Sequence, residues 1–310
     1  MLPADEIPAL TDPQRAAWLQ RIGIDATPAP TLAALDALIA AHLAHIPFEN
    51  LDALTGRRVD IDLPSVFRKL VDEHRGGYCF ELNTLFCAGL KSLGFHVTPL
   101  AARVRWNVPD TAPTGLSHML LRVEVAHESH IADVGFGGPT PDFALPLSLP
   151  ANGNAGYRLQ PAPASIATGG AAFHTYELAV RVAEDAHDDQ DPPDRTTADA
   201  ADSWRVMYRF DLTPQPQIDF VARNWYVSTH PDSHFTQTLM VARTDHSGAR
   251  LSLANGCLAE RRTDGAVRRT QLESPDAVIA LLTDRFGIRL DEGLRAALQV
   301  RLRALLAGSD

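Results

Sequence analysis

Apolar residues in the first third of the chain recur at the three- and four-residue steps of amphipathic helices. The clearest run follows Thr31, a residue type that caps helix N-termini, and it ends before Pro47. Its apolar positions are Leu32, Leu35, Ile39, Leu43 and Ile46. The same spacing predicts helices over residues 13–22, 64–73 and 79–93, so the chain begins with a helical part.

Beyond residue 96 the pattern changes to short runs of β-branched or alternating apolar residues, which are typical of strands. Strands are expected over residues 97–106, 119–125, 130–134, 176–182, 204–210, 237–243, 250–253 and 258–262. The second and third of these flank a turn at residues 127–129 and predict a hairpin. Helices over 275–285 and 291–306 close the chain, and this order of elements predicts an α+β fold in three parts.

Residues 183–202 interrupt the pattern between two expected strands. This segment, AEDAHDDQDPPDRTTADAAD, is acidic, contains prolines and has almost no large apolar side chains. Such a composition cannot bury enough apolar surface to fold by itself. We therefore predict an acidic, solvated surface insertion.

Composition and charge narrow the classes of function. Of 310 residues, 45% are hydrophobic and 21% are charged, as in ordinary soluble globular proteins. The formal net charge of −10 opposes non-specific attraction to nucleic acids and to anionic membranes. The N-terminus has no basic and apolar signal segment, no run approaches roughly 18 apolar residues, and the three cysteines include no CxxC pair. We therefore expect a cytoplasmic protein that binds neither nucleic acid nor membrane.

The most distinctive segment is RGGYCFELN, residues 75–83, in which Cys79 follows two glycines and opens a predicted helix. The positive end of the helix dipole favours the thiolate of a cysteine at that position. The glycines leave the approach to the sulfur open. Taken alone, Cys79 is either a nucleophile or a small buried hydrophobic residue, and most free cysteines are the latter. Cys87, about two helical turns later, is expected in the core.

A thiolate nucleophile needs an imidazole and a group that orients the imidazole. His118 begins the expected strand HMLLRVEV, and Asp133 lies near the end of the partner strand in HIADVGFGG. In a hairpin of these strands both residues lie at the same open end, so they are expected to meet. Without a thiol nearby, the same pair would have a structural role only.

Other residue types that carry chemistry give weaker signals. The run GFGG, residues 135–138, lacks the spacing of known phosphate loops and is either a tight turn or a place where a thioester or diphosphate approaches the backbone. His42 and His45 are three residues apart, and His230 and His234 are four apart, but neither pair has a third ligand at a known spacing. We expect no metal, and we expect His42 and His45 at helix surfaces or caps.

Taken together, five segments resemble the arylamine N-acetyltransferases, most closely their bacterial members. The segments are IPFENLDAL (46–54), RGGYCFELN (75–83), SHMLLRV (117–123), ADVGFGG (132–138) and NWYVSTHPDSHF (224–235). They follow one another in the order of the family, and the resemblance runs from about residue 10 to 290. It implies a helical domain over 1–94, a β-barrel-like domain over 95–212 with the acidic insertion, and a C-terminal α/β lid over 213–310.

The resemblance also implies a catalytic triad of Cys79, His118 and Asp133, the residues to which the motifs themselves point. The implied reaction is a ping-pong acyl transfer, in which the Cys79 thiolate takes an acetyl group from acetyl-CoA. An arylamine, arylhydrazine or N-hydroxyarylamine then accepts the acetyl group, so acetyl-CoA is the implied co-substrate. The family pattern places Phe48, Val104 and Phe136 around the acceptor, and Thr114, Gly115 and Gly137 at coenzyme A.

Three alternatives share these residues. A cysteine hydrolase or transglutaminase-like enzyme uses the same Cys-His-Asp arrangement and resolves the acyl-enzyme with water or a lysine amine. An amide synthase of the same family closes a macrolactam from a carrier-bound polyketide without free acetyl-CoA. A non-catalytic binding protein that kept the fold is the last alternative, and the intact Cys79, His118 and Asp133 argue against it.

Overall fold

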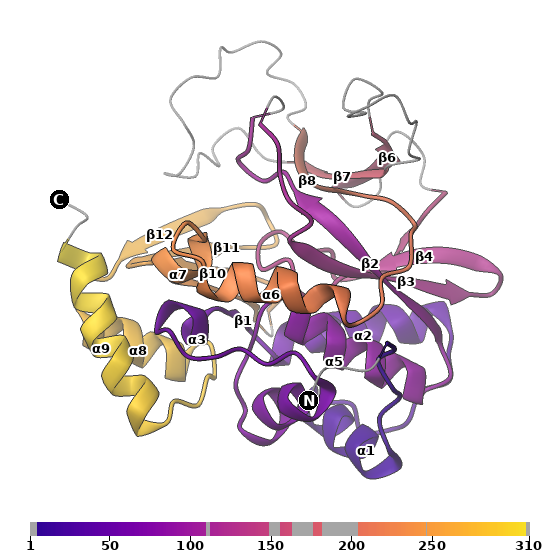
Figure 1. Cartoon of the computed structure of the whole chain (residues 1–310), viewed down its shortest axis with the longest axis horizontal. Coiled ribbons are helices and arrows are strands. Elements are labelled where there is room, and N and C mark those ends of the chain that lie inside the picture. The colour runs from indigo at the N-terminus through magenta and orange to yellow at the C-terminus, as the bar shows by residue number, and fades with distance from the viewer. Residues whose placement is uncertain are drawn as a thin grey trace.

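The N-terminal part of the computed structural model is helical, as the apolar spacing predicted (Figure 1). The structure describes residues 5–109, 112–148, 156–162, 176–181, 204–245 and 247–307. The elements up to residue 92 are α1 (Asp12–Arg21), α2 (Leu32–His45), β1 (Phe48–Glu49), α3 (Leu51–Leu54), α4 (Leu63–Phe67), a π-helical turn (Arg68–Asp72) and α5 (Cys79–Ser92). The single helix predicted over 64–73 is therefore an α-helix that continues as a π-helix.

A seven-stranded antiparallel sheet with a barrel-like curvature follows in the chain. Its strands, in spatial order, are β5 (Leu145–Pro146), β4 (Glu128–Ala132), β3 (His118–Val125), β2 (His96–Val104), β8 (Trp204–Phe210), β7 (Tyr176–Arg181) and β6 (Tyr157–Pro161). Strands β3 and β4 form the predicted hairpin. Its turn residues Ala126 and His127 have φ angles of 52° and 69°, as a two-residue hairpin turn requires. The open end of this hairpin carries His118 and Asp133.

Helix α5 is buried from Cys79 to Leu90. A helix that is apolar on most of its sides has to be surrounded by other elements. Helices α1 and α4 and strands β2 and β3 surround it here. Helix α1 comes especially close, because a Cβ at Gly89 would lie 2.6 Å from the Trp18 ring. This packing fixes the position of Cys79 at the N-terminus of α5.

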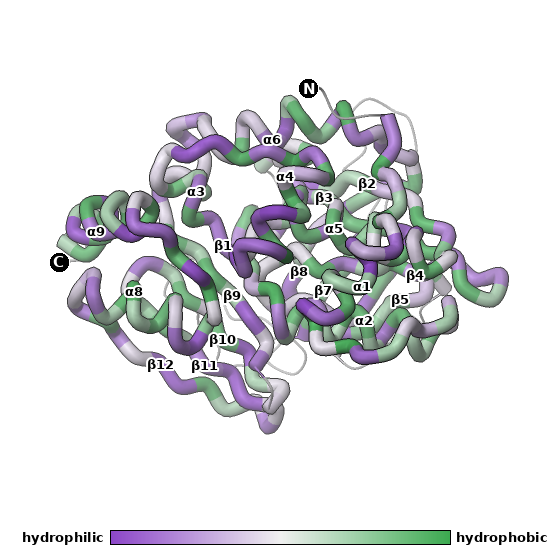
Figure 2. Tube along the Cα trace, turned by 90° about the horizontal axis from the view of Figure 1, so that it is seen from below, coloured by the Kyte–Doolittle hydropathy of each residue, from purple (hydrophilic) through white to green (hydrophobic). Residues whose placement is uncertain are grey.

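The C-terminal part builds a five-stranded antiparallel sheet in the order β1-β9-β10-β11-β12, to which β1 belongs although it lies early in the chain. The elements of this part are α6 (Asp219–Thr229), α7 (His234–Gln237), β9 (Met240–Thr244), β10 (Arg250–Ala254), β11 (Cys257–Arg261), β12 (Val267–Gln271), α8 (Pro275–Asp284) and α9 (Glu292–Ala307). Leu251, Leu253 and Leu258 of the sheet form a core with α8 and α9, which lie beside these strands (Figure 2). The opposite face of the sheet lines a cleft.

The structure has the α+β fold that the sequence predicted, but it also has elements that were not predicted, namely β1, α3, β5, β6, α6, α7 and β12. Helix α6 exposes Trp225 and Tyr226, so its large apolar residues do not follow one buried stripe. Strand β12 is polar on both of its faces and therefore lacks the alternation of a half-buried strand. The acidic segment 183–202 lies outside the described residues.

The predicted domain limits at residues 94 and 212 stay a prediction. Leu51 and Leu54 lie in the first of the three predicted domains, yet they pack in the core of the five-stranded sheet, α8 and α9. The N-terminal segment 46–54 is therefore shared between the helical part and the C-terminal part. It contributes Phe48 to the edge strand β1, beside the cleft.

Candidate active site

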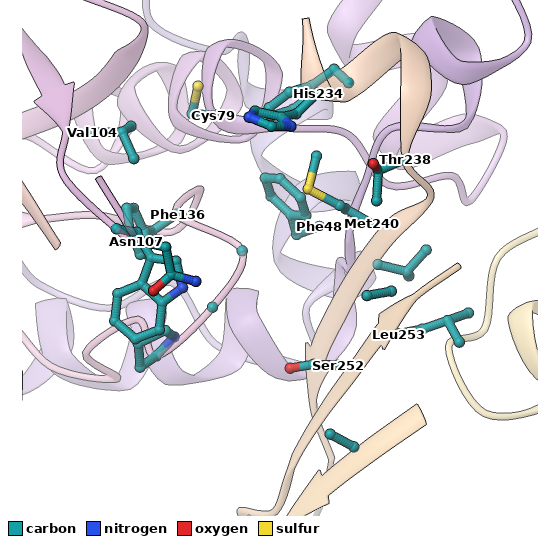
Figure 3. A pocket seen from close by; sticks show the side chains of 18 of the residues that line it. Phe48, Cys79, Val104, Asn107, Phe136, His234, Thr238, Met240, Ser252 and Leu253 are labelled. Carbon is teal, nitrogen blue, oxygen red and sulfur yellow. The ribbon is translucent and has the colours of Figure 1, made fainter. Parts of the chain in front are cut away.

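Cys79, the first residue of α5, lines the cleft and is 4% exposed (Figure 3). Its sulfur lies 3.8 Å from the backbone oxygen of Ser117, which accepts a weak hydrogen bond from the thiol. The backbone of Gly135 passes so close that a Cβ there would lie 2.6 Å from the Cys79 Cα. The glycine-rich run after Asp133 therefore packs closely against the backbone of Cys79.

Cys87 lies two turns further along α5 and is fully buried, as predicted. Burial raises the pKa of its thiol to about 12, which keeps Cys87 in the unreactive thiol form. Cys79 and Cys87 thus share a helix but not an environment, because Cys79 borders the cleft and contacts a histidine.

That histidine is His118, and it meets Asp133 as the hairpin predicted. The His118 Nε2 lies 2.7 Å from the Asp133 Oδ2, and both side chains are buried. Cys79 and His118 both line the cleft, and the Cys79 side chain is close enough to raise the pKa of the His118 ring. Because the carboxylate engages Nε2, Nδ1 is the ring nitrogen left for the sulfur. The structure therefore brings the three predicted residues together.

The electrostatics of this group favour a charged pair. Burial lowers the pKa of His118, but the negative charge of Asp133 and the hydrogen bonds to Asp133 and Cys79 raise it more, to about 10. Burial raises the pKa of Asp133, but His118 and the hydrogen bonds from Asn83 and the Gly135 N–H lower it further, so the carboxyl stays ionised. At neutral pH His118 is an imidazolium beside a carboxylate.

Two residues that sequence reasoning missed hold this group. The Asn83 Nδ2 donates to the Asp133 Oδ1 over 3.0 Å and to the Met119 backbone oxygen over 2.8 Å. The Tyr208 ring covers His118, with ring centroids 5.1 Å apart. The sequence feature that could have indicated Asn83 is its position four residues after Cys79 in a helix that is largely apolar. A buried side-chain amide at that position must find hydrogen-bond partners.

A buried ion network fixes the backbone that precedes Cys79. The Arg75 Nη2 lies 2.7 Å from the Glu49 Oε1, and the Lys69 Nζ lies 2.7 Å from the Glu81 Oε1. The other oxygen of Glu81 accepts a hydrogen bond from the backbone N–H of Tyr78, the residue before Cys79. These charged groups are paired and hydrogen-bonded, as buried charges must be.

The cleft in front of Cys79 has a volume of about 2690 Å³. Small-molecule sites usually measure roughly 300–1,000 Å³, so the cleft has room for more than one aromatic amine. The predicted acceptor residues Phe48, Val104 and Phe136 line it (Figure 3). Sequence reasoning missed Phe235, whose ring centroid lies 6.1 Å from that of Phe48, and Met240. Phe235 lies in the segment 224–235, to which no role was assigned.

The residues predicted at coenzyme A, Thr114, Gly115 and Gly137, also line the cleft. Gly137 has a φ of 82°, and a Cβ there would lie 2.7 Å from the Phe48 ring. At Gly115 a Cβ would meet nothing within 4 Å. Position 137 thus needs a glycine, because its φ angle is positive and because the Phe48 ring leaves no room for a Cβ. Gly115, in contrast, borders open space.

The histidines considered as metal ligands have other surroundings. The prediction that His42 lies at a helix surface or cap is wrong, because His42 is fully buried against Phe86. The His230 ring stacks on Tyr226 with centroids 4.5 Å apart. Among the described residues, no three histidine, cysteine or acidic side chains form a metal-binding group, and no helix is long and apolar enough to cross a membrane.

Comparisons with known proteins identify the family to which the chain is similar. The model of a family described as N-acetyltransferase matches residues 31–295. The chain is 38% identical to the arylamine N-acetyltransferase of Mycolicibacterium smegmatis over 93% of this chain and 97% of that protein. It is 33% identical to the arylamine N-acetyltransferase / N-hydroxyarylamine O-acetyltransferase of Salmonella typhimurium, over 95% of each. The structure of the Mycobacterium marinum arylamine N-acetyltransferase in complex with CoA is similar with a TM-score of 0.79 and 34% identity, over 94% of this chain and 98% of that one.

Proposed function

This chain belongs to the arylamine N-acetyltransferase family, and on that premise we propose that it transfers an acetyl group from acetyl-CoA to an arylamine through a thioester on Cys79. The observation that carries the proposal is that Cys79 lines the same cleft as His118, whose ring lies 2.7 Å from Asp133. Arylhydrazines and N-hydroxyarylamines are included among the acceptors, because they present a similar nucleophile on an aromatic ring.

Before acetyl-CoA arrives, the proton of the Cys79 thiol already resides on His118, so the reaction starts from a thiolate and an imidazolium. The thiolate then attacks the carbonyl carbon of acetyl-CoA, and the bond from that carbon to the sulfur of coenzyme A breaks. The leaving thiolate takes the proton from the His118 imidazolium and departs as free coenzyme A. The sulfurs of Cys79 and of coenzyme A are similar leaving groups, so the equilibrium between acetyl-CoA and the acetyl-enzyme favours neither side strongly.

The developing oxyanion needs hydrogen-bond donors. The backbone N–H of Cys79 precedes the first intrahelical bond of α5 and is one candidate. The Gly135 N–H already donates to the Asp133 Oδ1 over 2.8 Å. A second donor from the glycine-rich run therefore comes from a residue after Gly135.

In the second half-reaction the amine nitrogen attacks the acetyl carbon while Phe48 and Phe136 hold its aromatic ring. His118 accepts the proton that the amine loses, and Cys79 leaves as the thiolate. The amide formed is more stable than the thioester, which draws the reaction forward. Asp133 orients the His118 ring through the 2.7 Å contact and offsets its positive charge in both halves.

Intact-protein mass spectrometry tests the proposal. After mixing with acetyl-CoA alone, we expect the protein to gain one acetyl group of about 42 Da, which disappears when an arylamine is added. Cys79→Ala should show no gain, and Cys79→Ser should keep the fold but lose turnover. An acetyl group that persists on Cys79→Ala would contradict the mechanism. If the acetyl group is lost to water in the absence of the amine as fast as it is lost in its presence, the hydrolase alternative is favoured.

The proposal includes a cytoplasmic location. Cys79 and Cys87 are free thiols. A catalytic thiol must stay reduced, and the cytosol keeps thiols reduced whereas secretory compartments do not.

A further inference from the structure

Three arginines and a histidine from four separate segments meet where the helical part joins the C-terminal part. Arg21 is the last residue of α1, His74 precedes the segment that leads to Cys79, Arg243 belongs to β9, and Arg289 lies between α8 and α9. We call these four residues the Arg21 cluster. They are not among the residues that line the cleft in front of Cys79.

Two guanidinium groups of the cluster bind the C-terminal end of α2. The Arg21 Nη1 donates to the His45 backbone oxygen over 2.6 Å, and the Arg243 Nε donates to the Ala44 backbone oxygen over 2.6 Å. The Arg21 Nε also donates to the Leu70 backbone oxygen over 3.0 Å. Because Ala44 and His45 are the last two residues of α2, the two guanidinium groups lie beside consecutive peptide groups. The partial negative charge at a helix C-terminus attracts them there.

Further hydrogen bonds hold the loops of Arg289 and His74 at the same place. The Arg243 Nη1 donates to the Arg285 backbone oxygen over 3.3 Å, which fixes the start of the loop between α8 and α9. The backbone N–H of Arg289, later in that loop, donates to the His74 backbone oxygen over 3.3 Å. The two loops therefore join each other beside Arg243 and the end of α2.

The charges of the Arg21 cluster repel one another. Burial, and then the positive charges of Arg243 and Arg289, lower the pKa of Arg21 to about 10. Burial and the charges of Arg21 and Arg289 also lower the pKa of His74, although Asp72 opposes them. Like charges at such separations destabilise the folded chain unless an opposite charge lies among them.

The chain itself supplies little opposite charge to the cluster. Within the part of the chain that the structure describes, no carboxylate forms an ion pair with Arg21, Arg243 or Arg289. Asp245 acts on Arg243 from a longer distance, but its carboxylate is engaged by the backbone N–H and the hydroxyl of Ser247. The Nη2 groups of Arg21 and Arg243 and the whole Arg289 guanidinium have no hydrogen-bond acceptor among the described residues. These N–H groups are left for a ligand, although the chain as a whole has a net charge of −10.

We infer that the Arg21 cluster binds a phosphate group, either that of free inorganic phosphate or that of a phosphate monoester. A guanidinium presents parallel N–H donors that match two oxygens of a phosphate. A dianion among the three guanidinium groups removes their repulsion and supplies acceptors for the N–H groups that lack one. Binding there needs neither Cys79 nor the cleft, so the site does not depend on the proposed function.

Thermal unfolding in phosphate is the first test. At ten times its dissociation constant, phosphate should raise the Tm of the wild-type protein by about 2–4 °C above that in sodium chloride of equal ionic strength. Arg289→Ala should show no such rise. In chloride it should be at least as stable as the wild-type protein, because the Arg289 charge repels Arg21. Arg303→Ala is the matched control, since Arg303 is exposed near the C-terminal end of α9, whereas Arg289 precedes its N-terminal end.

Arg289→Glu places a carboxylate of the chain where the anion is expected. It should raise the Tm in chloride above that of the wild-type protein and abolish the response to phosphate, because the new carboxylate offsets the charges of Arg21 and Arg243. A Tm that rises equally with phosphate in the wild-type protein, Arg289→Ala and Arg289→Glu would show that phosphate acts elsewhere on the chain and would overturn the inference.

Calorimetry measures the binding directly. Inorganic phosphate should bind the wild-type protein and Arg303→Ala with equal affinity and bind Arg289→Ala at least tenfold more weakly. If glycerol phosphate binds the wild-type protein as tightly, the site takes phosphate monoesters, and if only inorganic phosphate binds, the site takes free phosphate. No binding to the wild-type protein, or equal affinities in all variants, would overturn the inference. A rise in the KM for acetyl-CoA in Arg289→Ala that equals its loss of phosphate affinity would also overturn it, because the cluster would then belong to the coenzyme A site.

Discussion

The Asn83 amide donates a 3.0 Å hydrogen bond to one oxygen of Asp133, while the other oxygen of that carboxylate lies 2.7 Å from the His118 ring. Asn83 stands one helical turn after Cys79, so it joins the helix that carries the thiol to the strand end that carries the carboxylate. Asn83 is not among the residues that line the cleft, where the residues predicted for the acceptor and for coenzyme A lie. Asn83 is therefore a positioning residue that acts through Asp133.

We expect Asn83→Ala to lower kcat/KM for acetyl transfer about 10- to 100-fold. The variant removes a hydrogen bond to the ionised carboxyl, so the pKa of Asp133 rises and its hold on the His118 proton weakens. The acid limb of the pH–rate profile should move to higher pH. Thr84→Ala, the next buried polar residue on α5, is the control. A lower rate with an unmoved acid limb would show that Asn83 only supports the fold.

The charge of Asp133 should decide how much thiolate forms at neutral pH. Burial favours the neutral imidazole of His118, and the carboxylate outweighs burial to bring the His118 pKa to about 10. Asp133→Asn keeps the shape and removes the charge, so burial then dominates and the His118 pKa falls. Alkylation of Cys79 by iodoacetamide at pH 7 should slow at least about tenfold.

The pH profile of alkylation checks this assignment. In the wild-type protein the imidazolium persists up to about pH 10, so its positive charge should keep the rate above that of Asp133→Asn throughout pH 6 to 9. Cys79→Ser identifies the labelled thiol, since only label lost in that variant belongs to Cys79. Equal profiles in the wild-type protein and Asp133→Asn would disprove the role of Asp133.

The contact of His118 with Asp133 could be predicted from the sequence, because a short hairpin turn fixes the register of neighbouring strands. The pairing of β1 with β9 could not, since it places Phe48 opposite Ala242, a residue far away in the sequence. Local periodicity carries no information about which strands become neighbours. The helices were predicted best where one apolar stripe faces the core.

His42 shows where that reasoning failed. Its apolar neighbours in sequence, Leu35, Leu38 and Ile39, occupy the same buried side of α2. His42 therefore lies on the same side of the helix as these apolar residues, but the polarity of its ring led to the prediction of a surface position. Helix α2 packs tightly enough that Phe86 of α5 covers the ring edge-on, at a centroid distance of 5.3 Å.

Gly137→Ala should be harmful and Gly115→Ala tolerated. At Gly137 the φ of 82° strains any larger residue, and a Cβ would lie 2.7 Å from the Phe48 ring. We expect a loss of about 1–3 kcal/mol in unfolding free energy and a higher KM for the arylamine, because Phe48 must move. At Gly115 a Cβ meets nothing within 4 Å, so stability should change little.

Thermal unfolding and steady-state kinetics of both glycine variants measure these effects. A Gly137→Ala protein with wild-type stability and an unchanged KM would show that Phe48 does not depend on the glycine. If Gly115→Ala raises the KM for acetyl-CoA at unchanged stability, that result supports the predicted place of Gly115 at coenzyme A.

The buried imidazole of His42 should make the protein sensitive to acid. Neither ring nitrogen has a hydrogen-bond partner among the described residues, and burial together with Arg21 and His45 lowers the His42 pKa to about 3. The unfolded chain binds a proton there below about pH 6.5, whereas the folded chain does not. The unfolding free energy therefore falls as the pH drops from 6.5 towards 3, by roughly 2 kcal/mol at pH 5.

His42→Leu removes the titrating group and fills similar space with an apolar side chain, which is neutral or stabilising where no hydrogen bond is lost. We expect its urea unfolding free energy to lose roughly 2 kcal/mol less between pH 7 and pH 5 than that of the wild-type protein. His96→Gln, at an exposed position, is the control and should keep the wild-type difference. If His42→Leu keeps the wild-type difference too, the acid sensitivity arises from other groups, because the only protonation removed by this substitution is that of His42.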